Sequence, residues 1–173
     1  IAAIETPDNQ DAYRKDLLQY FDVDGSFQVL LMTCEGLDSM DTVERKKLSY
    51  RIQVYLEDIT HNGSFFYYNS DFVLVANALS EEYLCNLVEK ALKRGKRRMP
   101  GLELCVGIGS RCIDVSQLSV SYQRAKAAAQ MAVTHKKQVV KFDDCGLFRL
   151  LYRVEDKKIL EEIERDCLAA LEE

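Results

Sequence analysis

The sequence is poor in the residues that build metal sites and membrane spans. Among its 173 residues there is no tryptophan, and there are only two prolines and two histidines. The histidines, His61 and His135, are isolated, so a histidine-based metal site is not expected. No apolar run reaches the roughly 20 residues that a membrane-spanning helix needs, and no signal peptide is visible. These features predict a cytoplasmic protein without a membrane partner. The chain begins at Ile1, and we expect it to be a piece of a longer protein.

Cysteine pairs are also absent. The six cysteines stand singly, without a Cys-x-x-Cys spacing, and several lie inside apolar runs: Cys34, Cys85, Cys105, Cys112, Cys145 and Cys167. A free cysteine in such a run behaves as a small hydrophobic side chain. The pattern favours reduced cysteines in a cytosolic protein over a disulfide framework or a metal centre. No metal and no cofactor is therefore expected.

Positive charge is in deficit. The net charge is −5, which argues against nucleic-acid binding by bulk electrostatics. The one basic cluster runs from Lys93 to Arg98. Cations at the end of a helix complement the helix dipole, and we favour that interpretation. A phosphate or nucleic-acid contact is the alternative.

Hydrophobic periodicity and cap residues predict a mixed α+β fold. Residues 27–34 form a nearly continuous apolar run, typical of a central strand covered on both faces. Asp41-x-x-Glu44 and Ser80 are typical helix starts, and Gly95 with Pro100-Gly101 is expected to end the second of these helices. The expected elements are a first helix near 7–20, strand 27–34, a helix from 42, strands 64–68 and 72–78, a helix from 81, strand 104–108, a helix from 114 or 116, a strand over 139–142, and helices at 146–151 and 154–171.

The order of these elements predicts a ferredoxin-like core with an added helix and strand, and with terminal helices on either side. The sheet is expected to be mainly antiparallel, with helices on its faces. The most informative stretch is Leu104 to Phe142, in which a glycine-containing strand precedes an alanine-rich helix. Small residues on the inner side of that helix allow it to lie close to the sheet. That inner side is predicted to be Leu118, Tyr122, Ala125, Ala128 or Ala129, and Ala132.

This stretch resembles the end of the GGDEF domain of nucleotide cyclases. It looks most like the degenerate GGDEF-like middle domain of PucR/CdaR-type transcriptional regulators, the purine-catabolism and sugar-diacid regulators. The resemblance covers roughly Phe21 to the end of the chain. The residues that carry it are Gly107, Gly109, Tyr122, Ala125, Phe142, Asp144, Gly146, Leu147, Leu150 and Leu151. It implies a cyclase-like sheet and a regulatory role.

The chain departs from the cyclase pattern where the resemblance places the signature hairpin. Cyclases need two glycines there, so that the backbone can approach a nucleotide, and acidic residues beside them. This sequence has Tyr68, Asn69, Ser70 and Asp71, followed by Phe72. Both glycines are replaced, and only Asp71 and Phe72 match. An ordinary hairpin turn is the favoured interpretation.

The other cyclase positions also differ. Only Glu35, after the first strand, could stand for the carboxylate that cyclases carry there. Ala132 and Val133 occupy the place of an Ala-Lys pair whose lysine contacts phosphate. Two-metal phosphoryl chemistry needs several carboxylates that converge on Mg²⁺. Glu35 and Asp71 with the Gly36 turn are therefore predicted to be a vestigial cleft, without catalytic residues.

The resemblance implies the following organisation. Residues 1–20 would be an N-terminal linker helix, 21–153 the GGDEF-like domain, and 154–173 a C-terminal helix that leads to a helix-turn-helix domain absent here. The expected function is non-catalytic regulation and dimerisation, coupling a sensory region to that DNA-binding domain. A homodimer and a small-molecule effector are expected partners, with DNA contacted only outside this chain. The alternative is a small-metabolite or nucleotide sensor that uses the vestigial cleft.

Overall fold

The computed structural model describes residues 25–34, 40–57, 63–68, 71–77, 80–98, 101, 103–146 and 148–151. The expected terminal segments 1–20 and 154–173 lie outside these residues and stay predictions. The described elements follow the predicted order: β1 (Phe27–Cys34), α3 (Thr42–Glu57), β2 (Gly63–Tyr68), β3 (Asp71–Asn77), α4 (Glu81–Arg98), β4 (Leu104–Ile108), η2 (Val115–Gln117), α5 (Leu118–Thr134), β5 (Val139–Lys141), η3 (Phe142–Asp144) and α6 (Phe148–Leu151).

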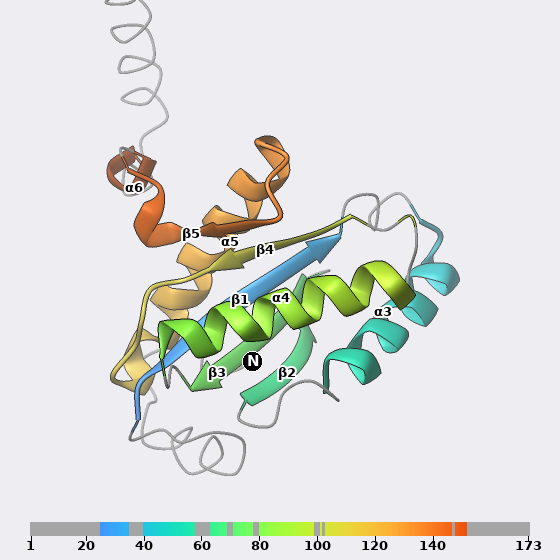
Figure 1. The fold of residues 1–173 in the computed structure, drawn as a ribbon, viewed down its shortest axis with the longest axis horizontal. Helices are drawn as coiled ribbons and strands as arrows, with labels where there is room; N and C mark the ends of the chain where they lie inside the picture. Colours follow the sequence, from blue (N-terminus) through green and yellow to red (C-terminus); the bar gives the residue numbers. More distant parts are fainter. Residues whose placement is uncertain are drawn as a thin grey trace, which may run out of the picture.

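The five strands form one sheet in the order β2-β3-β1-β4-β5. Only the β4–β5 pair is parallel, because α5 crosses between these strands, and the other three pairs are antiparallel. Figure 1 shows α3 and α4 on one face of the sheet and α5 on the other. The predicted α+β fold with a mainly antiparallel sheet and helices on its faces is confirmed.

The central strand β1 is buried on both faces. Successive side chains of a strand point to opposite faces, so its apolar run supplies two cores. Leu30 and Met32 join the core beneath α3 and α4. Phe27, Val29 and Leu31 join the core beneath α5. A continuous apolar run is what a strand between two helical layers requires.

Helix α5 lies close to the sheet because small residues face each other. A Cβ atom added to Gly107 of β4 would run into the backbone of Ala125 and Ala129. The predicted inner side of the helix is confirmed, since all of its members are buried: Leu118, Tyr122, Ala125, Ala128, Ala129 and Ala132.

Three helical starts carry the predicted side-chain caps. Asp41 Oδ1 accepts hydrogen bonds from the backbone N–H groups of Val43 and Glu44, at 2.7 and 3.1 Å. Ser80 Oγ accepts one from Tyr83 N at 3.0 Å. Asp114 caps the short 3₁₀ turn η2 that precedes α5, through Ser116 N at 2.8 Å. Each bond satisfies a donor that the first turn leaves without a partner inside the helix.

Four local expectations were wrong. Gly95 does not end α4, which continues to Arg98, and its missing side chain makes room for Leu104. Phe142 lies in the 3₁₀ turn after β5 rather than in the strand. Asp71 is the first residue of β3 and not part of the turn before it. Gly146 has φ +53° and precedes α6 instead of opening it.

Candidate functional site

The predicted site residues lie where the central strand ends and the β2–β3 hairpin turns. Asp71 opens β3, and its backbone pairs with that of Tyr68 at the end of β2. Thr33 is the last residue of β1 whose side chain is described. Glu35 and Gly36 follow β1 directly but lie outside the described residues. Asp71 is thus the one predicted site residue that the structure describes.

A cleft of about 500 Å³ opens beside Asp71, on the α5 face of the sheet. Strand alternation explains its position. Asp71 and Thr33 occupy odd-numbered positions, as do Leu31, Val73 and Val75, which face α5. We call this cavity the β1–α5 cleft. Its lining residues are Leu31 and Thr33 of β1, Asp71 of β3, and Lys126, Ala129, Gln130, Val133 and Thr134 of α5.

The cleft is polar at its rim and apolar at its floor. Lys126 and Asp71 bring one cation and one carboxylate to it, and Gln130 adds an exposed amide. The hydroxyl of Thr134 donates a 2.9 Å hydrogen bond to Gln130 O within the helix. Leu31 and Ala129 are buried beneath these groups. A few polar groups above an apolar floor suit a small polar molecule.

Sequence reasoning missed Lys126 and Gln130. It placed Val133 where cyclases carry a lysine, and Val133 does line the cleft. The positive charge comes instead from Lys126, about two helical turns earlier on the same side. Residues 126, 130, 133 and 134 follow the three-and-four spacing of one helical stripe. Extending that stripe backward from Val133 would have found both residues.

Two-metal chemistry has little support among the described residues. Asp71 is the only carboxylate among the cleft residues that the structure describes. Nowhere in the described part of the chain do three or more His, Cys, Asp or Glu side chains gather as a metal-binding group. The arrangement of Asp71 with Lys126 can hold a polar ligand by hydrogen bonds and charge. It does not supply the converging carboxylates that bridge two Mg²⁺ ions.

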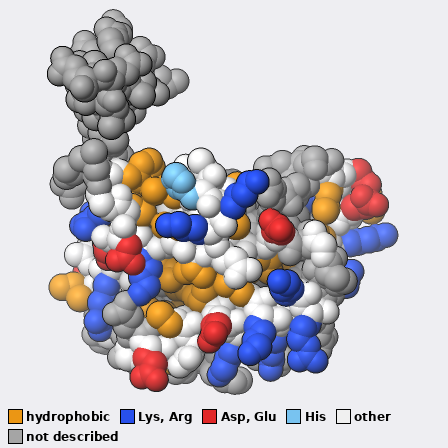
Figure 2. Space-filling model, turned by 45° about the horizontal axis from the view of Figure 1, so that its top comes forward, with side chains coloured by type: hydrophobic (Ala, Val, Ile, Leu, Met, Phe, Trp, Pro, Cys, Tyr) orange, Lys and Arg blue, Asp and Glu red, His pale blue; other side chains and the backbone are white. Residues whose placement is uncertain are grey.

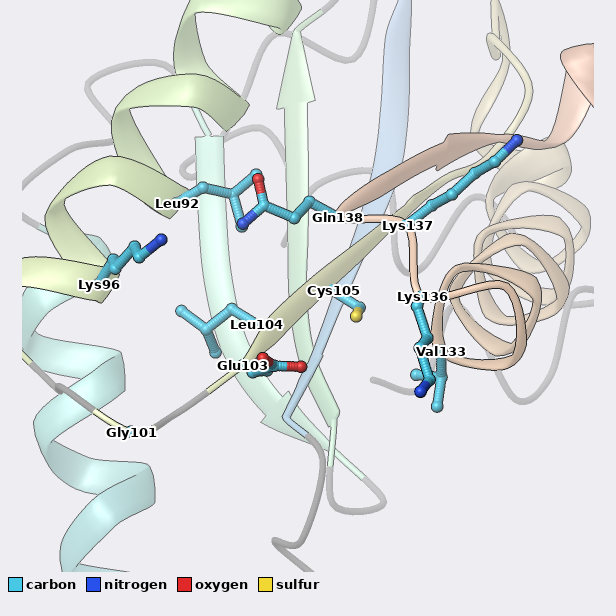
Figure 3. Close-up of a pocket in the computed structure, with 10 residues that line it drawn as sticks. All are labelled: Leu92, Lys96, Gly101, Glu103, Leu104, Cys105, Val133, Lys136, Lys137 and Gln138. Carbon is cyan, nitrogen blue, oxygen red and sulfur yellow. The ribbon is translucent and has the colours of Figure 1, made fainter.

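A second hollow, of about 390 Å³, lies where α4 and α5 end beside the start of β4. Figure 3 shows Lys96 reaching toward it from α4, whereas Lys137 extends away from it. The amide groups of Lys136 and Lys137 donate to Val133 O and Ala132 O and so close the end of α5. Lysines at two helix ends complement the negative ends of the helix dipoles. They are not arranged to converge on one ligand.

The basic cluster of α4 is solvent-exposed. Lys93, Lys96 and Arg97 all have exposed side chains. Figure 2 shows Lys and Arg side chains gathered along the lower edge of one face of the molecule. The position of the cluster in the last turns of α4 agrees with its expected role at a helix end.

No described helix is both long enough and apolar enough to cross a bilayer.

Comparison with solved structures identifies the fold. An EAL/GGDEF domain protein from M. capsulatus superposes with a TM-score of 0.59 at 14% identity, over 78% of this chain and 98% of that one. A microbial GGDEF domain, described for its interaction with cyclic di-GMP, gives 0.53 at 18% identity, over 76% and 88%. The coiled coil and GGDEF domain of DgcB from Caulobacter crescentus, in complex with c-di-GMP, gives 0.53 at 8%, over 76% and 80%.

Sequence comparison is more restricted. No curated protein sequence matches the chain. A family model described as a GGDEF-like domain matches residues 6–131, which is well over half of the chain. This match includes the hairpin, most of α5 and the residues of the β1–α5 cleft up to Gln130. The chain therefore belongs to the GGDEF-like domain family.

Proposed function

We propose that the chain is a non-catalytic regulatory and dimerisation domain of a bacterial PucR/CdaR-type transcriptional regulator. In this role it couples a sensory region to a DNA-binding domain outside the chain, and it acts in the cytoplasm as a homodimer. DNA is contacted only through that other domain. A small-molecule effector is the expected input.

The observation that carries the proposal is the hairpin between β2 and β3. Cyclases of this fold need glycines at that turn, but Tyr68, Asn69 and Ser70 stand there before Asp71. Each of these residue types carries a side chain, whereas glycine would leave the backbone open to a closely approaching nucleotide. Asp71 shares its cleft with Lys126 instead of a second described carboxylate. Both features support regulation over catalysis.

The second half of the chain supports the GGDEF-like fold on which this proposal rests. The glycines of its resemblance, Gly107 and Gly109, lie directly beneath α5, where added side chains would meet the helix backbone. Ala125 lies against Gly107, and Tyr122 of the same helix is buried. Four of the residues that carry the resemblance thus lie where α5 packs on the sheet.

The coding sequence beyond the codon for Glu173 tests this proposal. We expect a helix-turn-helix domain to follow within one domain length. A stop codon directly after Glu173, or an enzyme domain there, would contradict the regulator role. Either result would bring the β1–α5 cleft forward as the functional centre.

A second function, a sensor of small metabolites or nucleotides, is favoured by the β1–α5 cleft itself. Its volume of about 500 Å³ is within the usual range for a small-molecule site. Two of the solved structures that share the fold are described with cyclic di-GMP, which makes this dinucleotide a natural first probe. Lys126 would pair with its phosphates.

Thermal unfolding with cyclic di-GMP, GTP and Mg²⁺ tests the sensor function. A ligand at about 100 times its dissociation constant stabilises the folded state by about 2.7 kcal/mol, so Tm should rise with ligand concentration. Lys126→Ala should abolish the rise, whereas Lys90→Ala, an exposed lysine of α4, should leave it unchanged. A rise that survives Lys126→Ala would contradict binding in this cleft.

A further inference from the structure

Helix α3 presents apolar side chains on two opposite faces. Its inner face packs on the sheet through Ile52, which is fully buried, and through Leu48. On its outer face Val43, Tyr50 and Val54 are 61%, 69% and 48% exposed. Their spacing of seven and four residues places them on one line along the helix. The outward face of a surface helix is normally polar, so three large apolar side chains exposed along one line of it point to an interaction surface.

Cations flank this line of apolar residues. Lys46 and Lys47 are exposed and lie one helical turn from both Val43 and Tyr50, and the exposed Arg51 lies one turn from Val54. The whole surface is called the α3 stripe here and consists of Val43, Lys46, Lys47, Tyr50, Arg51 and Val54. Glu44 lies in the first turn, where a carboxylate complements the helix dipole. The stripe is apolar along its centre and positive at its sides.

The C-terminal segment 154–173 has the opposite character. Its sequence predicts a helix with Ile159, Ile163, Cys167 and Leu171 on one side. Acidic residues outnumber basic ones around that side and include Glu162 and Asp166. As a helix, residues 159–171 would span about 18 Å, against about 16 Å for residues 43–54 of the stripe. The two surfaces match in length and apolar character and have complementary charge.

Other occupants match less well. A second α3 stripe, packed against the first, would bring Lys46, Lys47 and Arg51 of both copies together, and like charges repel. A nucleic-acid backbone would pair with the cations but would leave Val43, Tyr50 and Val54 against phosphates. An anionic membrane surface would engage both the cations and the apolar line. Within this protein, the acidic segment 154–173 alone supplies a matching length, an apolar side and the opposite charge.

The position of the segment's start favours a second copy as its source. The segment follows α6, which comes after β5 at one edge of the sheet. Helix α3 lies toward the opposite edge, beside β2 (Figure 1). Four strand spacings of about 4.8 Å separate these edges, so a segment returning to its own α3 would use much of its length in crossing.

We propose that the α3 stripe of one protomer binds segment 154–173 of a second copy, and that the exchange is reciprocal. A two-fold dimer with two equal contacts results. The inference deepens the self-association part of the proposed function, on which it rests, by naming the surface and the segment. It does not depend on what the β1–α5 cleft binds.

Charge reversal in the full chain tests the contact. The variant Lys46→Glu/Lys47→Glu/Arg51→Glu should weaken the dimer at least about tenfold by sedimentation equilibrium, which corresponds to about 1.4 kcal/mol. The matched control is Lys90→Glu/Lys93→Glu/Arg97→Glu, which changes the charge equally on exposed residues of α4. This control should change the dimer constant by less than about threefold. Circular dichroism confirms that both variants are folded.

A reciprocal exchange supplies the stricter test. Adding Glu162→Lys/Asp166→Lys to the α3 variant should restore most of the lost affinity, because opposite charges again face each other. A dimer whose dissociation constant is unaffected by the α3 reversal would contradict the role of the α3 stripe, but not the proposed dimerisation itself. A chain that stays monomeric at all concentrations would contradict both the α3 contact and the proposed dimerisation. Stripe-dependent binding to phosphatidylserine vesicles without dimerisation would overturn the segment in favour of a membrane.

Discussion

Single residues set the spacing between α5 and the sheet. Gly107 lies beneath Ala125 and Ala129, and Gly109 lies beneath the backbone of Ser121. The Ser121 hydroxyl is buried, donates to Ser110 O at 2.7 Å, and accepts from Val29 N at 3.3 Å. One side chain of α5 thus contacts both β1 and the turn that follows β4. Such contacts tolerate neither added volume nor a lost polar partner.

Replacement of Gly107 by alanine should lower the free energy of unfolding by about 1–3 kcal/mol, because the new methyl group meets backbone that must shift. The matched control is Gly95→Ala in α4, whose methyl group meets only the movable end of Leu104. A gain of about 1 kcal/mol in helix propensity offsets that shift. Urea unfolding measures both, and equal stabilities of the two variants would contradict the close packing of α5.

Ser121→Ala should lower the free energy of unfolding by about 1–3 kcal/mol, because Ser110 O and Val29 N lose a buried hydrogen-bond partner. Ser119→Ala makes the same chemical change on the same helix at a half-buried position. Its effect should be small. Urea unfolding of the two variants measures both effects. A Ser121 variant as stable as the Ser119 variant would contradict a stabilising role of the Ser121 hydroxyl.

Burial raises the pKa of the neighbouring Cys112 thiol, more than the hydrogen bond from Ser121 lowers it. The side chain is 1% exposed and directs its sulfur at backbone oxygens of Ser110 and Gln117. The burial of the thiol and its donation to these backbone oxygens keep the cysteine a protonated, inert part of the core. It is therefore no candidate for catalysis or redox chemistry.

Among the elements, α3 depends on its first turn. The backbone N–H groups of Glu44 and Val43 hold the pKa of Asp41 below its ordinary value of 3.8. A carboxylate whose pKa is depressed in the folded state stabilises that state above pH 3.8. The stabilisation disappears as the pH falls through the folded value. The cap of α3, and with it the α3 stripe, is therefore weakened in acid.

Asp41→Ala should lower Tm at neutral pH, and its difference from the unaltered chain should shrink as the pH falls below 3.8. Asp41→Asn keeps a capping oxygen without the charge, so its deficit at neutral pH should be smaller. Thermal unfolding across the acid range measures both. A deficit of Asp41→Ala that stays constant down to acid pH would show that the ionised cap contributes nothing.

The elements were largely predictable because their signals are local. The apolar run of β1, the caps at Asp41 and Ser80, and the alanine side of α5 each follow from a few neighbouring residues. The end of α4 was not predictable from Gly95, because that glycine serves a contact with Leu104 that only the tertiary fold creates. Lys126 was missed although it lies on one helical stripe with Val133, because only the tertiary fold shows that this stripe lines a cleft at the end of β1.

Over the whole molecule, three features bear on function together. The hairpin lacks the glycines of cyclases, Lys126 and Asp71 both line the β1–α5 cleft, and the α3 stripe lies on the opposite face of the sheet. A ligand in the cleft and a partner on α3 could then occupy the domain at once. That separation of surfaces suits a domain that transmits a signal.

Incubation of the chain with GTP and Mg²⁺, followed by chromatography of the nucleotides, tests the central claim that this GGDEF-like domain does not catalyse. A working GGDEF cyclase, assayed in parallel, shows that the conditions support the reaction. We predict that the chain forms no cyclic dinucleotide above the background without protein. Accumulation of a cyclic dinucleotide that Asp71→Asn abolishes would contradict the claim and make the chain a cyclase.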